Sequence, residues 1–103
     1  MRVMVIALLR TKLHPEADRS AYEALGARMF ELVQTMPGFL GADEYAAANG
    51  ETLGVIRFES LEALRTWREH PEHLEAQRRG KAEFYVTYTI EVCDVVRAYS
   101  FAR

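Results

Sequence analysis

Residues 36–67 read MPGFLGADEYAAANGETLGVIRFESLEALRTW, and they carry the most specific structural signals in the chain. Residues 39–47 and 52–59 have the apolar, β-branched and aromatic content of strands. Between them, the pair Asn49-Gly50 can supply the positive φ angles that a tight hairpin turn needs. The stretch therefore predicts a β-hairpin.

A helix is expected directly after the hairpin. Ser60 is a good N-cap, because its hydroxyl can accept a hydrogen bond from a free N–H of the first turn. Pro71 interrupts this helix and can begin a second short one. Gly80 is then the expected C′ residue of that second helix. On the first of these two helices, one face is formed by Leu61, Leu64 and Trp67.

The segment before the hairpin predicts a strand and a helix. Residues 2–10 form an apolar run without polar interruption, typical of a buried strand. His14-Pro15-Glu16 then favours a helix start, since proline at the first helical position gives up only an unpaired N–H. An apolar stripe at three- and four-residue spacing continues this helix to just before Met36.

Residues 84–101 alternate apolar and polar side chains and predict one long last strand. Phe84, Val86, Tyr88, Ile90, Val92 and Val96 are expected on one face, and Tyr85, Thr87, Thr89, Glu91 and Arg97 on the other. At ~3.3 Å per residue the strand would span roughly 60 Å, whereas a domain of this size is only ~33 Å across. It must therefore bend, break or extend onto a second subunit.

The predicted order is β-α-β-β-α-β, an α+β fold of the ferredoxin-like type in one domain, residues 1–103. Helices cover only one face of such an antiparallel sheet, so the other face needs a cover. On the first strand, the side chains of both faces are apolar. We therefore expect a homodimer that packs sheet against sheet.

Composition excludes several partners. The chain has 13 basic and 15 acidic residues in 103, 50% hydrophobic residues and one cysteine, Cys93. This balance lacks the basic footprint of a nucleic-acid-binding protein, and no run approaches the ~20 apolar residues of a membrane span. A single cysteine forms no intrachain disulfide, which favours a cytoplasmic protein. No cysteine-ligated metal site is expected.

A pocket between helices and sheet is the expected ligand site. Its candidate lining is Met29, Phe30, Phe39, Phe58, Trp67, Tyr85 and Tyr88, with Arg57, Gln77 and Arg97 as polar groups. This mixture suits a flat apolar ligand with a few hydrogen bonds, and it suits a core equally well. We expect Trp67 to border this cavity, with its indole partly accessible. His70 and His73 are either solvent-facing or capping residues, or ligands for a metal or haem.

Three runs resemble the antibiotic biosynthesis monooxygenase domain family: residues 36–39, residues 58–67 and residues 70–77, followed by a glycine and a tyrosine-rich strand. The resemblance implies ferredoxin-like homodimers that form a dimeric α+β barrel, with a ligand cavity in each subunit. In the anthrone-oxidising members it implies oxygenation of an aromatic substrate without metal or flavin. Trp67 matches their pocket tryptophan, and the resemblance allows Tyr85, Tyr88 or Arg97 to orient or stabilise the substrate anion.

Two alternatives stay open. The haem-degrading members combine a first-strand asparagine, a tryptophan and an iron-ligating histidine about ten residues later. This chain keeps Trp67, but Gln77 stands at the histidine position and Ala7 on the first strand, where no asparagine occurs. The other alternative is a non-catalytic dimeric ligand-binding or stress-related module. The leading hypothesis is a cofactor-independent monooxygenase of a small hydrophobic aromatic or quinone-like metabolite.

Overall fold

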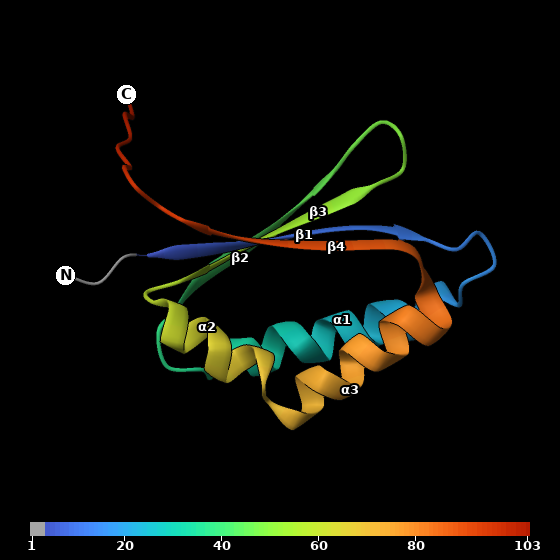
Figure 1. The fold of residues 1–103 in the computed structure, drawn as a ribbon. Helices are drawn as coiled ribbons and strands as arrows, with labels where there is room; N and C mark the ends of the chain where they lie inside the picture. Colours follow the sequence, from blue (N-terminus) through green and yellow to red (C-terminus); the bar gives the residue numbers. More distant parts are fainter. Residues whose placement is uncertain (1–3) are drawn as a thin grey trace.

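A computed structural model describes residues 4–103 and confirms the ferredoxin-like α+β arrangement (Figure 1). The strands are β1 (Val5–Leu13), β2 (Phe39–Ala46), β3 (Thr52–Phe58) and β4 (Tyr85–Asp94). The helices are α1 (Arg19–Val33), α2 (Leu61–Arg68) and α3 (Pro71–Arg79), and a π-helix, Gly80–Phe84, joins α3 to β4. The predicted first strand begins at residue 2, which lies outside the described residues.

The sheet has the order β2-β3-β1-β4, and each neighbouring pair is antiparallel. All three helices lie on the same side of it (Figure 1). Val5 and Ala7 of β1, Phe58 of β3, Val33 of α1 and Trp67 of α2 are buried between the two layers. This core lies at the end of the molecule where α2 meets the sheet.

The hairpin is confirmed, but its turn differs from the expected one. Gly50 has a φ of +89°, whereas no non-glycine residue of the described chain has a positive φ. A two-residue turn with both central residues left-handed is therefore absent. The loop is instead closed by a hydrogen bond from the Ala47 N–H to the Glu51 carbonyl, 2.8 Å long.

The first helix starts later than predicted. His14-Pro15-Glu16 forms a turn, in which the Ala17 N–H donates to the His14 carbonyl. Asp18 is the N-cap, and its carboxylate accepts from the Ala21 N–H at 3.0 Å. Asp18 is a stronger N-cap than His14, because its short side chain offers a charged acceptor to the free N–H groups of the first turn. The second His-Pro-Glu does open a helix, since His70 is the N-cap of α3.

Gly80 does not end the helix as a left-handed residue. Its φ and ψ are −55° and −49°, and the chain continues into the π-helix. A Cβ at this position would lie 2.5 Å from Cε2 of Tyr85. Glycine is therefore required here because the Tyr85 ring occupies the space of a side chain.

The last strand is shorter than predicted. β4 ends at Asp94, and residues 95–103 leave the body of the molecule in an extended path (Figure 1). Within the single chain Val96, Tyr99 and Phe101 are 82–93% exposed. The strand thus ends at Asp94, which pairs with Val5 of β1, and one further main-chain hydrogen bond joins the Val95 N–H to the Met4 carbonyl.

Candidate functional site

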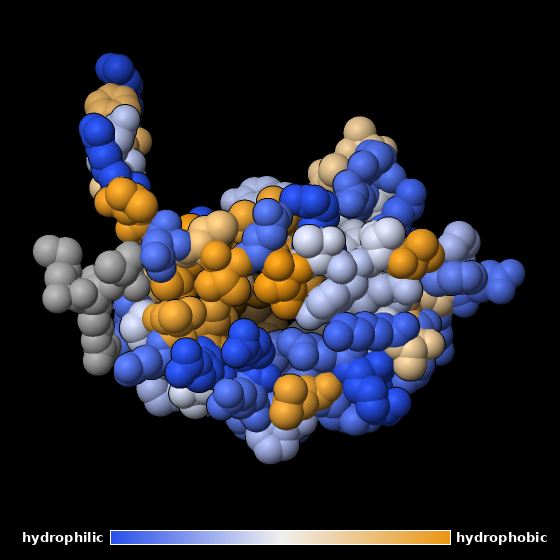
Figure 2. Space-filling model, in the orientation of Figure 1, coloured by the Kyte–Doolittle hydropathy of each residue, from blue (hydrophilic) through white to orange (hydrophobic). Residues whose placement is uncertain are grey.

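An apolar hollow lies between β4 and the helices α2 and α3 (Figure 2). Tyr88, Ile90 and Val92 of β4 are paired with Thr11, Leu9 and Ala7 of β1, respectively. Opposed residues of an antiparallel pair point to the same face, so these three point toward the helices. Yet Ile90 and Val92 are 39% and 44% exposed. The helices therefore leave this part of the sheet uncovered.

The inner face of α3 brings His73 and Gln77 to the same side of the helix, four residues apart. Both side chains are half-buried. The His73 ring is stacked on Trp67, with the ring centroids 4.3 Å apart and an interplanar angle of 27°.

The expectation of a partly accessible Trp67 is wrong. Its side chain is 5% exposed and belongs to the core. Phe58 is fully buried, Phe39 packs edge-to-face on it at 5.7 Å, and Met29 packs against the same core. These four candidates therefore belong to the core or pack directly against it.

The two histidines of α3 differ in their surroundings. The Nδ1 atom of His70 accepts a hydrogen bond from the Glu72 N–H at 3.1 Å, so His70 is a capping residue. The Nδ1 atom of His73 is enclosed and has no hydrogen-bond partner. Burial lowers the pKa of His73, and the nearby carbonyl groups of Arg68 and Trp67 offset this only in part. The His73 ring is therefore neutral at neutral pH.

A tyrosine cluster lies at the end of β4 next to the π-helix. The ring of Tyr85 is 6.0 Å from Tyr22 of α1 and 5.7 Å from Tyr88. A break in the β1–β4 register after Lys12 turns Tyr85 toward the helices. Its predicted place on the opposite face from Tyr88 is therefore wrong.

Burial is the main cause that raises the pKa of all three tyrosines. The pKa of Tyr85 is raised most of the three, and after burial the interactions with Tyr22 raise it further. The three hydroxyl groups stay protonated at neutral pH and can donate hydrogen bonds. They are suited to hold a ligand oxygen rather than to remove a proton from it.

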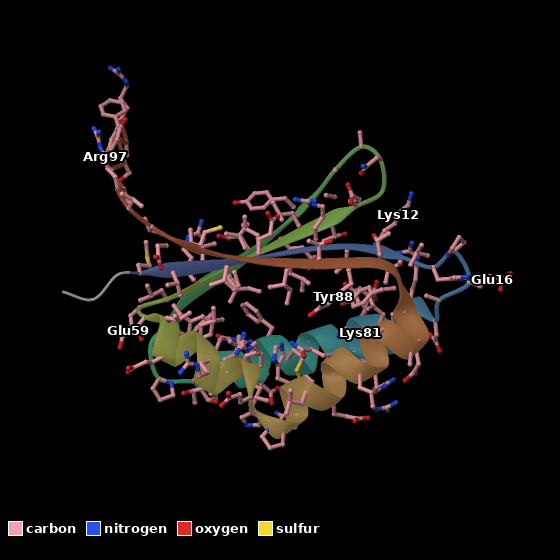
Figure 3. All side chains as sticks on the ribbon, in the orientation of Figure 1. Lys12, Glu16, Glu59, Lys81, Tyr88 and Arg97 are labelled. Carbon is pink, nitrogen blue, oxygen red and sulfur yellow. The ribbon has the colours of Figure 1, made fainter. Side chains whose placement is uncertain are left out.

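Charge at this end comes from Lys81, whose ammonium group lies 5.2 Å from the centroid of the Tyr88 ring (Figure 3). Arg97 lies in the extended tail, far from Tyr88 (Figure 3), and its guanidinium group is over the ring of Tyr99. The structure of one chain therefore does not bring Arg97 to the hollow. Lys81 and Tyr22 were not predicted as site residues from the sequence. Their position in the chain gives no sign of such a role, because only the packing of α1 and the π-helix against β4 brings them to the tyrosine cluster.

No group of three or more histidine, cysteine, aspartate or glutamate side chains within residues 4–103 is arranged to hold a metal ion. None of the helices in this range has the length and apolar character needed to cross a membrane.

Comparison with known proteins assigns the family. A model of the family described as antibiotic biosynthesis monooxygenase matches residues 4–79. The chain belongs to this family. The uncharacterized Bacillus subtilis protein YqjZ is 32% identical over 95 residues, which are 92% of this chain and 82% of YqjZ.

Two solved structures share the fold of this chain. Rv0793 from Mycobacterium tuberculosis has a TM-score of 0.81 and 26% identity, and the match covers 94% of this chain and 99% of Rv0793. SnoaB from Streptomyces nogalater, a cofactor-independent oxygenase, has a TM-score of 0.73 and 16% identity, with 98% and 99% of the two chains covered.

Proposed function

We propose that this protein is a cofactor-independent monooxygenase that oxidises a small hydrophobic aromatic or quinone-like metabolite. The apolar hollow between β4 and the helices carries this proposal, because it combines the uncovered side chains of Ile90 and Val92 with the hydroxyl of Tyr88 (Figures 2 and 3). Such a mixture of apolar walls and few polar groups is typical of a small-molecule site. Membership of the monooxygenase family supports the same conclusion.

The proposed chemistry needs a substrate that becomes electron-rich when it loses a proton. The anion of a phenol or anthrone passes one electron to dioxygen, and the two radicals combine to a peroxide. Loss of water from the peroxide leaves a quinone, so that anthrone and O₂ give anthraquinone and H₂O. The protein binds the substrate, excludes water and stabilises the anion. Tyr85 and Tyr88 are proposed to donate hydrogen bonds to the substrate oxygens.

A homodimer is part of this proposal. Leu8 and Val55, which oppose each other in the sheet, point to the face that carries no helix, and Tyr45 nearby is 56% exposed. The ion pairs Arg10–Glu91 and Arg57–Asp43, both 3.1 Å long, lie on the same face. A second copy would bury this face, and its extended tail, residues 95–103, would find apolar contacts that one chain does not offer.

The dimer is tested by sedimentation equilibrium of Leu8→Glu, with Leu74→Glu as the matched control. Leu74 is 49% exposed on α3, on the helix side of the molecule. We expect Leu8→Glu to sediment as a monomer and the control to remain a dimer with the wild type. A monomeric wild-type protein at low micromolar concentration would contradict this part of the proposal.

The activity is tested with a dissolved-oxygen electrode and dithranol, an anthrone, in the presence of a metal chelator. We expect oxygen uptake above the rate of autoxidation, together with the absorbance of the quinone product. Uptake equal to that with heat-inactivated protein would overturn the oxygenase proposal and favour the non-catalytic module. A stoichiometric Soret shift on addition of haemin would favour the haem-binding alternative.

The cytoplasm is the proposed location. The single cysteine, Cys93, is free and exposed on β4, which suits a reducing compartment.

A further inference from the structure

Lys81 brings a positive charge to the end of the hollow at which β4 begins. It lies in the π-helix, and its ammonium group is 5.2 Å from the centroid of the Tyr88 ring, so that the two side chains lie next to each other between β4 and the helices (Figure 3). No carboxylate of residues 4–103 forms an ion pair with this ammonium group, whereas Arg79, two residues earlier, is paired with Glu83 at 3.0 Å. The charge of Lys81 is therefore available to a ligand.

Tyr88 offers a second polar group at the same place. Within the described part of the chain, no hydrogen bond uses its hydroxyl. Burial raises the pKa of this hydroxyl, which stays protonated and can donate to a ligand. Glu44 acts differently on the three tyrosines, because its negative charge contributes to the raised pKa of Tyr22 and Tyr85 but not to that of Tyr88. A ligand anion is therefore favoured beside Tyr88 and Lys81 and disfavoured beside the other two tyrosines.

The rest of the hollow is apolar along β4. Tyr88, Ile90 and Val92 are alternate residues of this strand, so their side chains stand about 6.6 Å apart and form one row roughly 13 Å long. The helices leave Ile90 and Val92 uncovered. The row thus has an apolar end at Val92 and a positively charged end at Tyr88 and Lys81. A flat apolar ligand with one anionic group at its edge would match both ends.

We propose that the hollow binds an aromatic carboxylate, whose rings lie along Ile90 and Val92 and whose carboxylate accepts hydrogen bonds from Lys81 and Tyr88. This inference rests on the proposed function and narrows its substrate class to aromatic acids. One ammonium group and one neutral hydroxyl balance a single negative charge, which suits a carboxylate better than a doubly charged phosphate. A carboxylate is ionised at neutral pH, whereas an ordinary phenol is not. Lys81 therefore selects the ligand before any reaction begins.

The test compares two ligands that differ in charge and share the same rings: anthraquinone-2-carboxylate and anthraquinone-2-carboxamide. Equilibrium dialysis against the whole protein at neutral pH and low salt gives the dissociation constant of each, and needs no turnover. We expect the wild-type protein to bind the carboxylate about tenfold more tightly than the amide, as one charge-assisted hydrogen bond provides. Added salt should weaken the binding of the carboxylate and leave that of the amide unchanged.

The variants separate charge from packing. Lys81→Met keeps an apolar stem but removes the charge, so the ratio of the two dissociation constants should fall to about one. Lys81→Arg should restore most of the preference, because it restores the charge. Lys12→Met is the matched control: Lys12 pairs with Thr87, the neighbour of Tyr88 in the strand, and lies on the face without helices (Figure 3). The ratio is measured within each protein, so a general loss of packing cancels from it.

Equal affinity for the acid and the amide in the wild-type protein would overturn the inference, and so would a preference that persists in Lys81→Met. Absence of binding of both ligands would overturn it as well, because the hollow would then not be a site for flat aromatic molecules. The oxygenase proposal is judged separately with dithranol, which has no carboxylate. Oxygen uptake with dithranol but no preference for the acid would remove this inference alone. A Lys81-dependent preference without oxygen uptake would uphold the inference and remove the oxygenase proposal.

Discussion

Replacing Gly80 by alanine tests the packing that supports the tyrosine cluster. Gly80 has helical φ and ψ, so alanine alone would favour the helix by about 1 kcal/mol. The new Cβ, however, would lie 2.5 Å from Cε2 and 3.0 Å from Cδ2 of Tyr85. The Tyr85 ring cannot turn away freely, because it packs against Tyr22 and Tyr88.

The expected cost follows from these opposing effects. Forcing extra atoms into a packed site costs roughly 1–3 kcal/mol. After the helix gain is subtracted, we expect Gly80→Ala to lower the free energy of unfolding by about 0–2 kcal/mol. Gly26→Ala is the matched control: Gly26 lies inside α1, and a Cβ there meets nothing within 4 Å. This control should gain about 1 kcal/mol.

The difference between the two variants isolates the steric effect, since both exchange the same residues in a helix. The difference in the free energy of unfolding should be about 1–3 kcal/mol, or a separation in Tm of roughly 4–24 °C for a domain of this size. Urea unfolding followed by far-UV circular dichroism measures it, at one fixed protein concentration for all variants. Tyr85→Ala should remove the penalty, so Gly80→Ala should become stabilising in that background.

Equal stabilisation by Gly80→Ala and Gly26→Ala would refute the reasoning. It would mean that the Tyr85 ring does not occupy the space beside Gly80, and the account of why a glycine stands there would fall with it.

Three further predictions concern the fold, the dimer and pH. Gly38→Ala should destabilise by about 2–4 kcal/mol in urea unfolding, because the left-handed φ of +82° costs about 1–2 kcal/mol and the Cβ would lie 2.7 Å from that of Ala63. At Gly50 φ is +89°, and a Cβ would meet only Cε of Lys12 at 3.7 Å, an ordinary contact. Gly50→Ala should therefore show only the backbone cost, and equal losses in the two variants would argue against the clash at Gly38. Removal of residues 96–103 should raise the dissociation constant of the dimer at least about tenfold, measured by sedimentation equilibrium. The reason is that the apolar side chains of the tail, exposed in one chain, would no longer be buried against the partner. An unchanged dissociation constant would mean that the tail has no role in the dimer. Burial holds the folded pKa of His73 below its ordinary value of 6.5, so the unfolded chain binds the proton first, and stability should fall as the pH is lowered from 7.5 to 5.5. The loss should be smaller in His73→Gln, and identical pH profiles for the two proteins would contradict the burial of this imidazole.

The amino-acid sequence by itself determined the order of the elements. Ser60 is the N-cap of α2, and its hydroxyl accepts from the Ala63 N–H at 3.1 Å. Pro71 begins α3 as expected, and the hairpin with Gly50 joins β2 to β3. These features depend on residues close together in the chain, and a local hydrogen bond or a fixed φ is the same in many folds. The same holds for His70, whose capping role needs only its neighbours.

Tertiary structure decided the candidate site. The resemblance to the family made Trp67 the expected ligand contact, but packing buried its side chain and stacked His73 on it. Tyr85 changed face because one irregularity in the pairing of β1 with β4 shifts the two-residue alternation of side chains. Arg97 lies away from the site because β4 ends at Asp94 and the chain after it leaves the sheet (Figure 1). Each of these outcomes depends on contacts between distant residues, whose geometry follows from register and packing and is not encoded in any one segment.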